Sequence, residues 1–111
     1  MTEISPSERQ QIADYRRLQQ DYMALQENRT RARIELEQIK RALSYLGDAS
    51  EESDVFKRVG SLMVKTNPVK LKEELSERKG ILEKYIMRVD QQIRTIEKRM
   101  KKIEDDLKMR Q

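Results

Sequence analysis

Residues 55–66 (Val-Phe-Lys-Arg-Val-Gly-Ser-Leu-Met-Val-Lys-Thr) have the composition of a β-hairpin, whereas the sequence on both sides has the periodicity of long helices. Strand-favouring residues flank Gly60-Ser61, which suits a two-residue turn. A hairpin of this length is marginally stable in water, and both of its edges are left unpaired. We therefore expect it to pair with hairpins of other chains, so the protein is predicted to be part of an oligomer.

The two-residue turn also predicts which side chains share a face, because directly opposed residues of a hairpin point to the same side. One face carries three opposed pairs, namely Val59 with Leu62, Lys57 with Val64, and Val55 with Thr66. The other face carries Phe56, Arg58, Met63 and Lys65. Since the first face is apolar except for Lys57, and closing a sheet removes its edges, we expect a β-barrel built by several chains. The residues expected to carry this oligomerisation are Val55, Phe56, Val59, Gly60, Leu62, Met63 and Val64.

The composition favours long helices over a wide globular core. Only 36% of the 111 residues are apolar and 40% are charged, and the sequence has no Trp. A narrow apolar stripe along amphipathic helices needs few buried residues, and it leaves the charged faces in water. We expect a mainly α protein in which residues 1–111 form a single domain, an antiparallel two-helix coiled coil joined by the hairpin.

Capping signals predict where the two helices begin and end. Ser5-Pro6 followed by Glu8 has the pattern of a capping box with Pro at the first helical position. Asn67-Pro68 repeats the combination of a capping residue and Pro before the second helix. Gly47 follows the last apolar residue of the first helix, as a C′ glycine does. The expected order is a helix over about 6–46, an acidic loop over 47–54, the hairpin over 55–66 and a helix over about 68–110.

Each helix carries an apolar seam, by which we mean apolar positions that repeat at alternating spacings of three and four. The seam of the first helix is Tyr15, Leu18, Tyr22, Leu25, Ala32, Leu36, Ile39, Leu43 and Leu46. The seam of the second helix is Leu75, Leu82, Ile86, Val89, Ile93, Ile96, Met100, Ile103 and Leu107. Arg29 stands at a seam position, where a polar residue can fix the register. The preferred interpretation is that its methylenes lie along the seam and its guanidinium reaches water.

The order of these segments, with Val59-Gly60, Leu62, Val64-Lys65 and the helix start at residues 71–75 (Leu-Lys-Glu-Glu-Leu), closely resembles the β-type subunit of prefoldin, a co-chaperone. The resemblance covers nearly the whole chain, and a single hairpin favours the β type because α-type subunits are longer and carry two hairpins. It implies a hexamer of two α and four β subunits, whose hairpins form two barrels above six coiled coils. It also implies nucleotide-independent binding of unfolded or nascent polypeptides at the coiled-coil tips, and their delivery to a group II chaperonin in the cytoplasm.

The free end of the helix pair is the expected client-binding site. Ile4 precedes the first cap, Ile12 lies off the seam of the first helix, and Met109 lies off the seam of the second. Antiparallel pairing brings these residues to one end, where exposed and flexible apolar side chains suit weak, promiscuous binding. The predicted tip residues are Ile4, Ile12, Tyr15, Ile103, Leu107 and Met109. Frayed helix ends or plain seam packing explain the same residues equally well.

The charge distribution raises nucleic-acid binding as an alternative. The net charge is +4, and residues 70–111 carry all of it, with 13 basic and 9 acidic side chains against 11 of each in residues 1–69. Residues 98–102 form a basic stretch, but acidic residues flank it and no aromatic residue interleaves it. A solvated helix face is therefore favoured over a phosphate-binding track. For this reason nucleic acid is not an expected partner. A membrane is not an expected partner either, because no apolar run is long enough to span a bilayer.

The residue inventory argues against catalysis. The sequence has no His and no Cys, so the usual general bases, nucleophiles and metal ligands reduce to carboxylates, Lys and Tyr. We expect no enzyme activity, no metal and no cofactor. Two classes of function remain. One is an ATP-independent holdase that captures unfolded chains through several weak contacts, and the other is a structural coiled-coil adaptor or scaffold that holds specific partners on the same platform.

Overall fold

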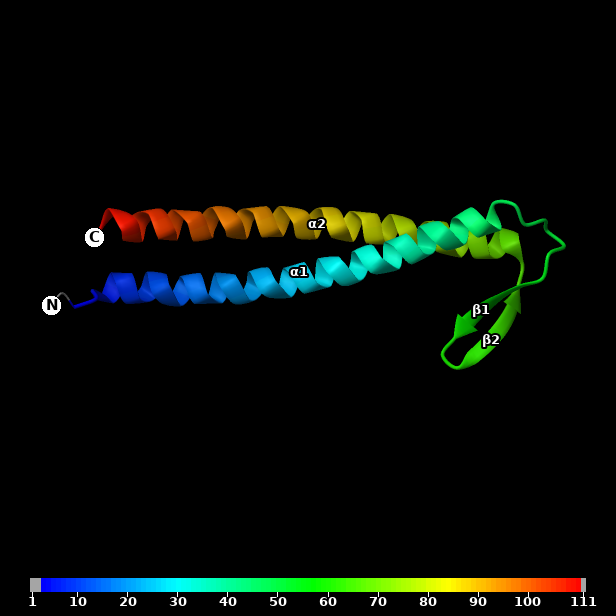
Figure 1. Ribbon diagram of the computed structural model, residues 1–111, viewed down its shortest axis with the longest axis horizontal. Coiled ribbons are helices and arrows are strands. Elements are labelled where there is room, and N and C mark those ends of the chain that lie inside the picture. Colours follow the sequence, from blue (N-terminus) through cyan, green and yellow to red (C-terminus); the bar gives the residue numbers. More distant parts are fainter. Residues whose placement is uncertain (1–2, 111) are drawn as a thin grey trace. The chain divides into compact units, whose positions relative to one another are not determined.

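The computed structural model describes residues 3–110 and consists of two long helices joined through one β-hairpin (Figure 1). The elements follow in the order α1 (Pro6–Leu46), β1 (Val55–Val59), β2 (Leu62–Thr66) and α2 (Pro68–Met109). The predicted mainly α fold with a single antiparallel hairpin is therefore confirmed. The second helix ends one residue earlier than the sequence indicated.

Both helices begin at the capping residues that the sequence indicates. At α1 the backbone N–H of Glu8 donates to Ser5 Oγ at 3.1 Å, and Ser5 Oγ donates to Glu8 Oε1 at 3.0 Å. At α2 the backbone N–H of Lys70 donates to Asn67 Oδ1 at 2.8 Å. Each cap satisfies an N–H that has no partner inside its helix, which is why the helices start at these residues.

The end of α1 differs from the predicted C′ glycine. Gly47 follows the helix directly, and its N–H donates to the Leu43 carbonyl at 3.0 Å. Its φ is not in the left-handed region, because Gly60 alone among the described residues has a positive φ, at 62°. The chain leaves the helix through a tighter turn, in which the Ala49 N–H donates to the Leu46 carbonyl at 3.1 Å. The position of the helix end is confirmed, whereas the left-handed conformation that usually accompanies it is absent at Gly47.

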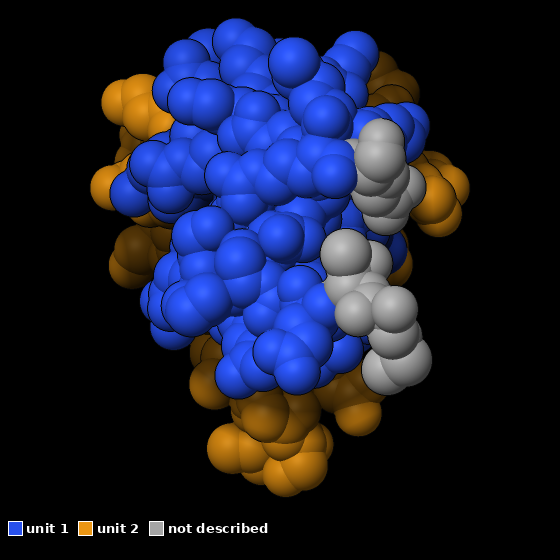
Figure 2. Space-filling view, turned by 90° about the vertical axis from the view of Figure 1, so that its left-hand side faces the viewer, with its two compact units in different colours: residues 1–31, 87–111 blue, residues 32–86 orange. Residues whose placement is uncertain are grey.

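The chain divides into two compact units, which Figure 2 shows in different colours. Unit 1 comprises residues 1–31 and 87–111, and unit 2 comprises residues 32–86. Unit 2 has a core in which Ala32, Ile39 and Leu82 are buried together. The half-buried apolar residues packed against this core are Leu36, Leu43, Leu75, Tyr85 and Ile86. Both predicted seams therefore supply the packing of unit 2.

In unit 1 the first part of α1 lies beside the last part of α2 (Figure 1). Four side-chain hydrogen bonds join these two stretches of chain: Arg29 with Asp90, Tyr15 with Glu104, Gln11 with Asp106, and Ser7 with Arg110, which directly follows α2. Residue numbers fall along α1 in this series while those of the partners rise along α2, so the two helices are antiparallel as predicted. The buried apolar residues of this unit lie on α2 and are Val89 and Ile93.

Arg29 does not simply extend into water. Its Nη1 lies 2.8 Å from Asp90 Oδ1, and both side chains are half-buried. The carboxylate of Asp90 therefore neutralises the positive charge of Arg29 at the seam position. The preferred interpretation of the sequence had instead placed the Arg29 guanidinium in water. Asp90 was missed because it lies beside the seam of α2 rather than in it.

The hairpin has the predicted register. Val59 pairs with Leu62, Lys57 with Val64, and Val55 with Thr66. The positive φ of Gly60 explains why glycine stands at this turn, since the left-handed region costs a residue with a Cβ about 1–2 kcal/mol.

Candidate functional site

The hairpin exposes most of its apolar side chains to solvent. We use the term hairpin surface for the predicted oligomerisation residues Val55, Phe56, Val59, Gly60, Leu62, Met63 and Val64. Of these, Leu62 and Met63 are the most exposed apolar side chains, at 66% and 64%, and Val55 is half-buried. Phe56 and Met63 show that the second face is exposed as well as the first. An exposed apolar cluster on a short hairpin indicates a surface that is completed by a partner.

The edges of the hairpin are also open. Among the described residues, β1 pairs only with β2, so the outer edge of each strand presents unpaired N–H and C=O groups. Such edges are templates for pairing with further strands. The exposed side chains and the open edges thus both favour assembly through β-structure.

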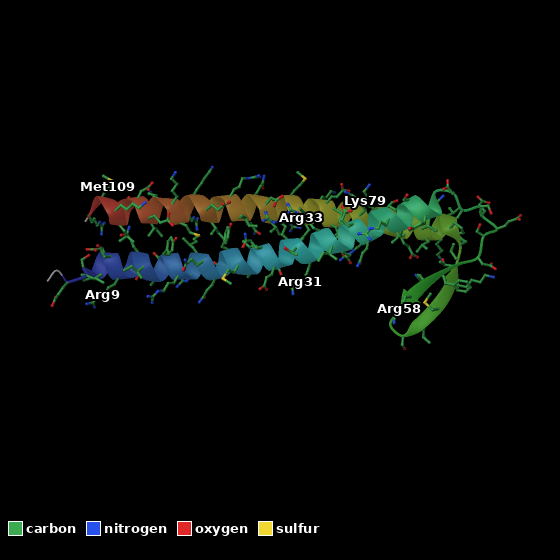
Figure 3. All side chains as sticks on the ribbon, viewed as in Figure 1. Arg9, Arg31, Arg33, Arg58, Lys79 and Met109 are labelled. Atoms are coloured by element: carbon green, nitrogen blue, oxygen red, sulfur yellow. The ribbon has the colours of Figure 1, made fainter. Side chains whose placement is uncertain are left out.

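Ion pairs fix the base of the hairpin. Lys57, the polar residue on the otherwise apolar face, is drawn toward α2, where its Nζ lies 3.1 Å from Glu74 Oε2. Lys65 Nζ lies 3.1 Å from Asp54 Oδ1 in the preceding loop. Near the turn, Arg58 Nε donates to the Gly60 carbonyl at 3.2 Å, and Figure 3 labels Arg58 on the hairpin. The contact of Lys57 with Glu74 neutralises the one cation on the apolar face, whereas Arg58 and Lys65 belong to the other face.

The predicted tip residues all belong to unit 1. Ile4 is 48% exposed and Met109 is 85% exposed. Ile12 was expected to lie off the seam, but it is half-buried, as are the remaining tip residues, Tyr15, Ile103 and Leu107. Figure 3 shows Arg9 and Met109 at the same end of this unit, where both ends of the described chain lie. Of the six predicted tip residues, Ile4 and Met109 are therefore exposed, and the other four are half-buried.

Polar contacts that the sequence did not indicate close this end of the helix pair. Arg110 Nη1 donates to Ser7 Oγ at 3.2 Å, and Gln11 Nε2 donates to Asp106 Oδ2 at 3.4 Å. Gln11 Oε1 is buried and finds no hydrogen-bond partner in the described part of the chain. Gln11 lies four residues before Tyr15, so extending the heptad count backward would have placed it in the seam.

Tyr15 connects the two helices at the base of the tip. Its hydroxyl donates a short hydrogen bond to Glu104 Oε1. This hydrogen bond, with desolvation and repulsion from the Glu104 charge as smaller causes, raises the pKa of the Tyr15 phenol above its ordinary value. The phenol in the folded chain consequently keeps its proton to a higher pH than an ordinary tyrosine does.

Metal centres and membrane-spanning helices are two features that are common in other proteins. Within residues 3–110, no group of three or more acidic side chains is placed to hold a metal ion. Neither helix contains, over the same residues, a stretch apolar enough to cross a membrane.

Comparison with known sequences identifies relatives over almost the whole chain. A family model described as "Prefoldin subunit" matches residues 9–111. The prefoldin subunit beta of Methanothrix thermoacetophila is 27% identical over 106 residues, which cover 96% of this chain and 88% of that protein. The prefoldin subunit beta of Methanosphaerula palustris is 32% identical over 83 residues, covering 75% of this chain and 69% of that protein.

Comparison with solved structures gives the same fold. The crystal structure of the prefoldin beta subunit from Thermococcus strain KS-1 superposes with a TM-score of 0.85 and 24% sequence identity, covering 98% of this chain and 96% of that chain. The beta2 subunit of the same strain gives a TM-score of 0.73 at 12% identity, covering 82% of this chain and 97% of that one. From the family match, these relatives and the shared fold, the chain belongs to the prefoldin family of chaperone subunits and resembles its β type.

Proposed function

We propose that this chain is a subunit of an ATP-independent holdase, which binds unfolded or nascent polypeptides at the tip residues and delivers them to a group II chaperonin. It assembles through the hairpin surface with α-type subunits, two α and four β per hexamer, and acts in the cytoplasm. Residues 1–111 work as one domain. The chain has no catalytic role, uses no metal or cofactor, and binds neither nucleic acid nor a membrane.

The observation that carries this proposal is that exposed apolar side chains are present both on the hairpin and at the tip, in addition to those that lie elsewhere along the helices, such as Met23 and Met87. Leu62 on the hairpin is 66% exposed and Met109 at the tip is 85% exposed, on a chain in which 40% of the residues are charged. The hairpin surface combines exposed side chains with open strand edges, which suits permanent assembly. The tip has exposed side chains but no strand edge, which suits reversible contact with chains of varied sequence.

Weak binding at one tip is compatible with effective capture. Ile4 and Met109 offer a small apolar area, so a single tip holds an unfolded chain only briefly. Several tips on one platform raise the effective concentration for the second and third contacts, and avidity then replaces a deep binding site. Release requires only that these separate contacts dissociate in turn, so the cycle needs no nucleotide.

The test is suppression of aggregation of a chemically unfolded model protein, without nucleotide, by the chain assembled with an α-type subunit. The double substitution Ile4→Ser and Met109→Ser is expected to reduce protection strongly while the assembly keeps its size. A chain trimmed of residues 1–12 and 104–111 is expected to lose protection altogether. The matched control is Met23→Ser with Met87→Ser, which removes exposed methionines on the same helices but outside the tip.

Equal loss of protection in the tip variant and the methionine control would contradict a tip-specific site. Absence of protection by the unmodified assembly would contradict the holdase altogether. That second result, combined with selective binding of one folded ligand, would favour the adaptor function instead.

A further inference from the structure

A groove runs along the helix pair of unit 1 and adjoins the tip. It consists of two neighbouring hollows of about 610 Å³ and 340 Å³, which share Leu18, Asp21 and Arg99. The tip residue Ile103 lines the smaller hollow, so the groove begins at the tip and continues toward Arg88.

The floor of the groove is apolar and incompletely covered. Its apolar residues Leu18, Leu25, Ile96 and Ile103 are all seam positions, and all are only half-buried. Other seam positions are buried, among them Val89 and Ile93 in unit 1 and Ala32, Ile39 and Leu82 in unit 2. The larger hollow is also lined by Ala24 on α1 and by the polar residues Gln91, Gln92 and Thr95 on α2. Because none of these four is a large apolar residue, the apolar floor stays partly uncovered.

The rim of the groove is positively charged. The lining includes the basic residues Arg17, Arg88, Arg99 and Lys102 and the acidic residues Asp14 and Asp21, which leaves an excess of two positive charges. Asp14 already accepts a hydrogen bond from Gln10 Nε2 at 3.0 Å. In the described part of the chain, the side chains of Arg17, Arg99 and Lys102 are exposed and take part in no ion pair or hydrogen bond. These three cations are available to a ligand.

We propose that this groove binds extended segments of non-native polypeptides in which acidic side chains alternate with apolar ones. This inference rests on the proposed holdase function and narrows the class of polypeptide that the tip region prefers. Alternate side chains of an extended segment point to opposite sides, so apolar groups face the floor while carboxylates remain within reach of the long rim cations.

The size of the groove fits such a segment. Leu18 to Leu25 spans seven residues of helix, or about 10 Å at 1.5 Å per residue. An extended peptide covers that distance with about three residues. Gln91 and Gln92 line the same length and supply amide donors and acceptors for its backbone.

A nucleic acid fits the groove less well than a peptide. No aromatic side chain lines either hollow, so bases have no stacking partner. The apolar floor also favours a ligand with apolar side chains over one with a regular row of phosphates.

The experiment measures fluorescence anisotropy of a labelled peptide of alternating Leu and Glu, titrated with the full-length chain in its assembled form. A peptide with Lys in place of Glu and an oligothymidylate of similar length are the comparison probes. The groove variant is Arg99→Glu with Lys102→Glu. The matched control is Lys98→Glu with Lys101→Glu, which makes the same charge change in the same stretch at residues that do not line the groove.

The acidic peptide is expected to bind the groove variant about tenfold more weakly than the unmodified protein, and the control variant less than about twofold more weakly. Equal weakening in both variants, or equal binding of the Lys peptide, would overturn the inference. So would oligothymidylate binding that is lost with the same two substitutions, because the groove would then be a phosphate site.

This outcome is distinguishable from failure of the holdase itself. If the groove variant binds the acidic peptide normally while Ile4→Ser with Met109→Ser abolishes protection against aggregation, the inference about the groove is wrong and the holdase stands. If the unmodified assembly suppresses no aggregation, the proposed function fails whatever the peptide result.

Discussion

Arg29 and Asp90 show how a charged residue is accommodated in an apolar seam. The side chains keep 23% and 29% of their exposure, so water still reaches the pair. An ion pair of this kind gains little net stability, because partial desolvation offsets much of the attraction. Its two charges meet in one alignment of the helices only, and a shifted register would leave Arg29 against apolar side chains. We therefore expect the pair to select the register of unit 1.

Replacing Asp90 with Ala is expected to lower the free energy of unfolding by about 1 kcal/mol, because the half-buried Arg29 guanidinium then lacks its charged partner. Urea unfolding followed by circular dichroism measures the change. Glu37→Ala is the control, since Glu37 pairs with Lys40 at 3.8 Å on an exposed face and its loss should cost less than about 0.5 kcal/mol. Equal effects of the two substitutions would show that position 90 is energetically an ordinary surface site.

The raised pKa of Tyr15 predicts an alkaline limit to the stability of the tip. In the unfolded chain the phenol loses its proton near pH 10, whereas in the folded chain it keeps the proton to higher pH. The unfolded state therefore binds fewer protons in this range, so the stabilising contribution is complete below about pH 10 and is lost as pH rises through the folded pKa. The absorbance of tyrosinate, compared between the unmodified chain and Tyr15→Phe, is expected to give a midpoint above 10 for Tyr15.

Glu104→Gln provides the control for this titration, because it removes the charged acceptor while keeping the shape of the side chain. The midpoint of Tyr15 should then fall toward the ordinary value for tyrosine. A midpoint that is unchanged in Glu104→Gln would mean that the hydrogen bond to Glu104 is not the main cause of the shift.

At the scale of the elements, two glycines with different conformations predict opposite effects of substitution. Gly60 has a φ of 62° in the hairpin turn, so Gly60→Val should strain the turn and weaken assembly, while Gly60→Asn should be tolerated. Gly80 lies inside α2, and a Cβ added there meets nothing within 4 Å. Gly80→Ala should therefore stabilise the chain by about 0.5–1 kcal/mol.

Thermal unfolding measures the Gly80 effect, and size-exclusion chromatography of the assembly measures the Gly60 effect. Destabilisation by Gly80→Ala would point to a close contact at this site in the assembled state. Full assembly of Gly60→Val would show that the hairpin forms equally well with a different turn.

The elements themselves were predictable because local signals specify them. Ser5 and Asn67 mark helix starts through hydrogen bonds to residues three positions away, and the turn at Gly60 sets the register of the whole hairpin. The conformation of Gly47 was not predictable, since a glycine after a helix permits the left-handed region without requiring it. Local patterns thus give the position of an element end more reliably than its geometry.

The candidate site was predictable only in part, because its polar contacts depend on which residues of different elements face each other. The apolar tip residues followed from the heptads and from antiparallel pairing. The contacts of Asp90, Glu104 and Glu74 involve partners 61, 89 and 17 residues away along the chain, respectively. Charged residues are so frequent on these helices that spacing alone does not distinguish these carboxylates from their neighbours.

At the scale of the whole molecule, the hairpin is the short segment on which exposed apolar side chains follow one another most closely, with Phe56, Val59, Leu62, Met63 and Val64 all exposed. In the described chain no strand other than β1 and β2 is present, so the hairpin surface cannot be covered by the chain's own sheet. Burying one exposed apolar side chain contributes about 1.5–3 kcal/mol, and several such residues per hairpin give assembly a substantial driving force. The two faces of the hairpin remain to be distinguished, since Leu62 on one and Met63 on the other are almost equally exposed.

Leu62→Glu and Met63→Glu distinguish them as a matched pair. The face of Val59, Leu62 and Val64 is apolar once Lys57 is held by Glu74, so we expect it to line the interior formed by several hairpins. A carboxylate at Leu62 would then be buried without a partner, and Leu62→Glu should release free subunits at concentrations where the unmodified chain is assembled. Met63→Glu should weaken the assembly much less than Leu62→Glu does, because the face of Met63 also carries Arg58 and Lys65 and stays partly in water. Light scattering coupled to chromatography decides between the faces. The reverse result would place Phe56 and Met63 in the interior and turn the hairpin over.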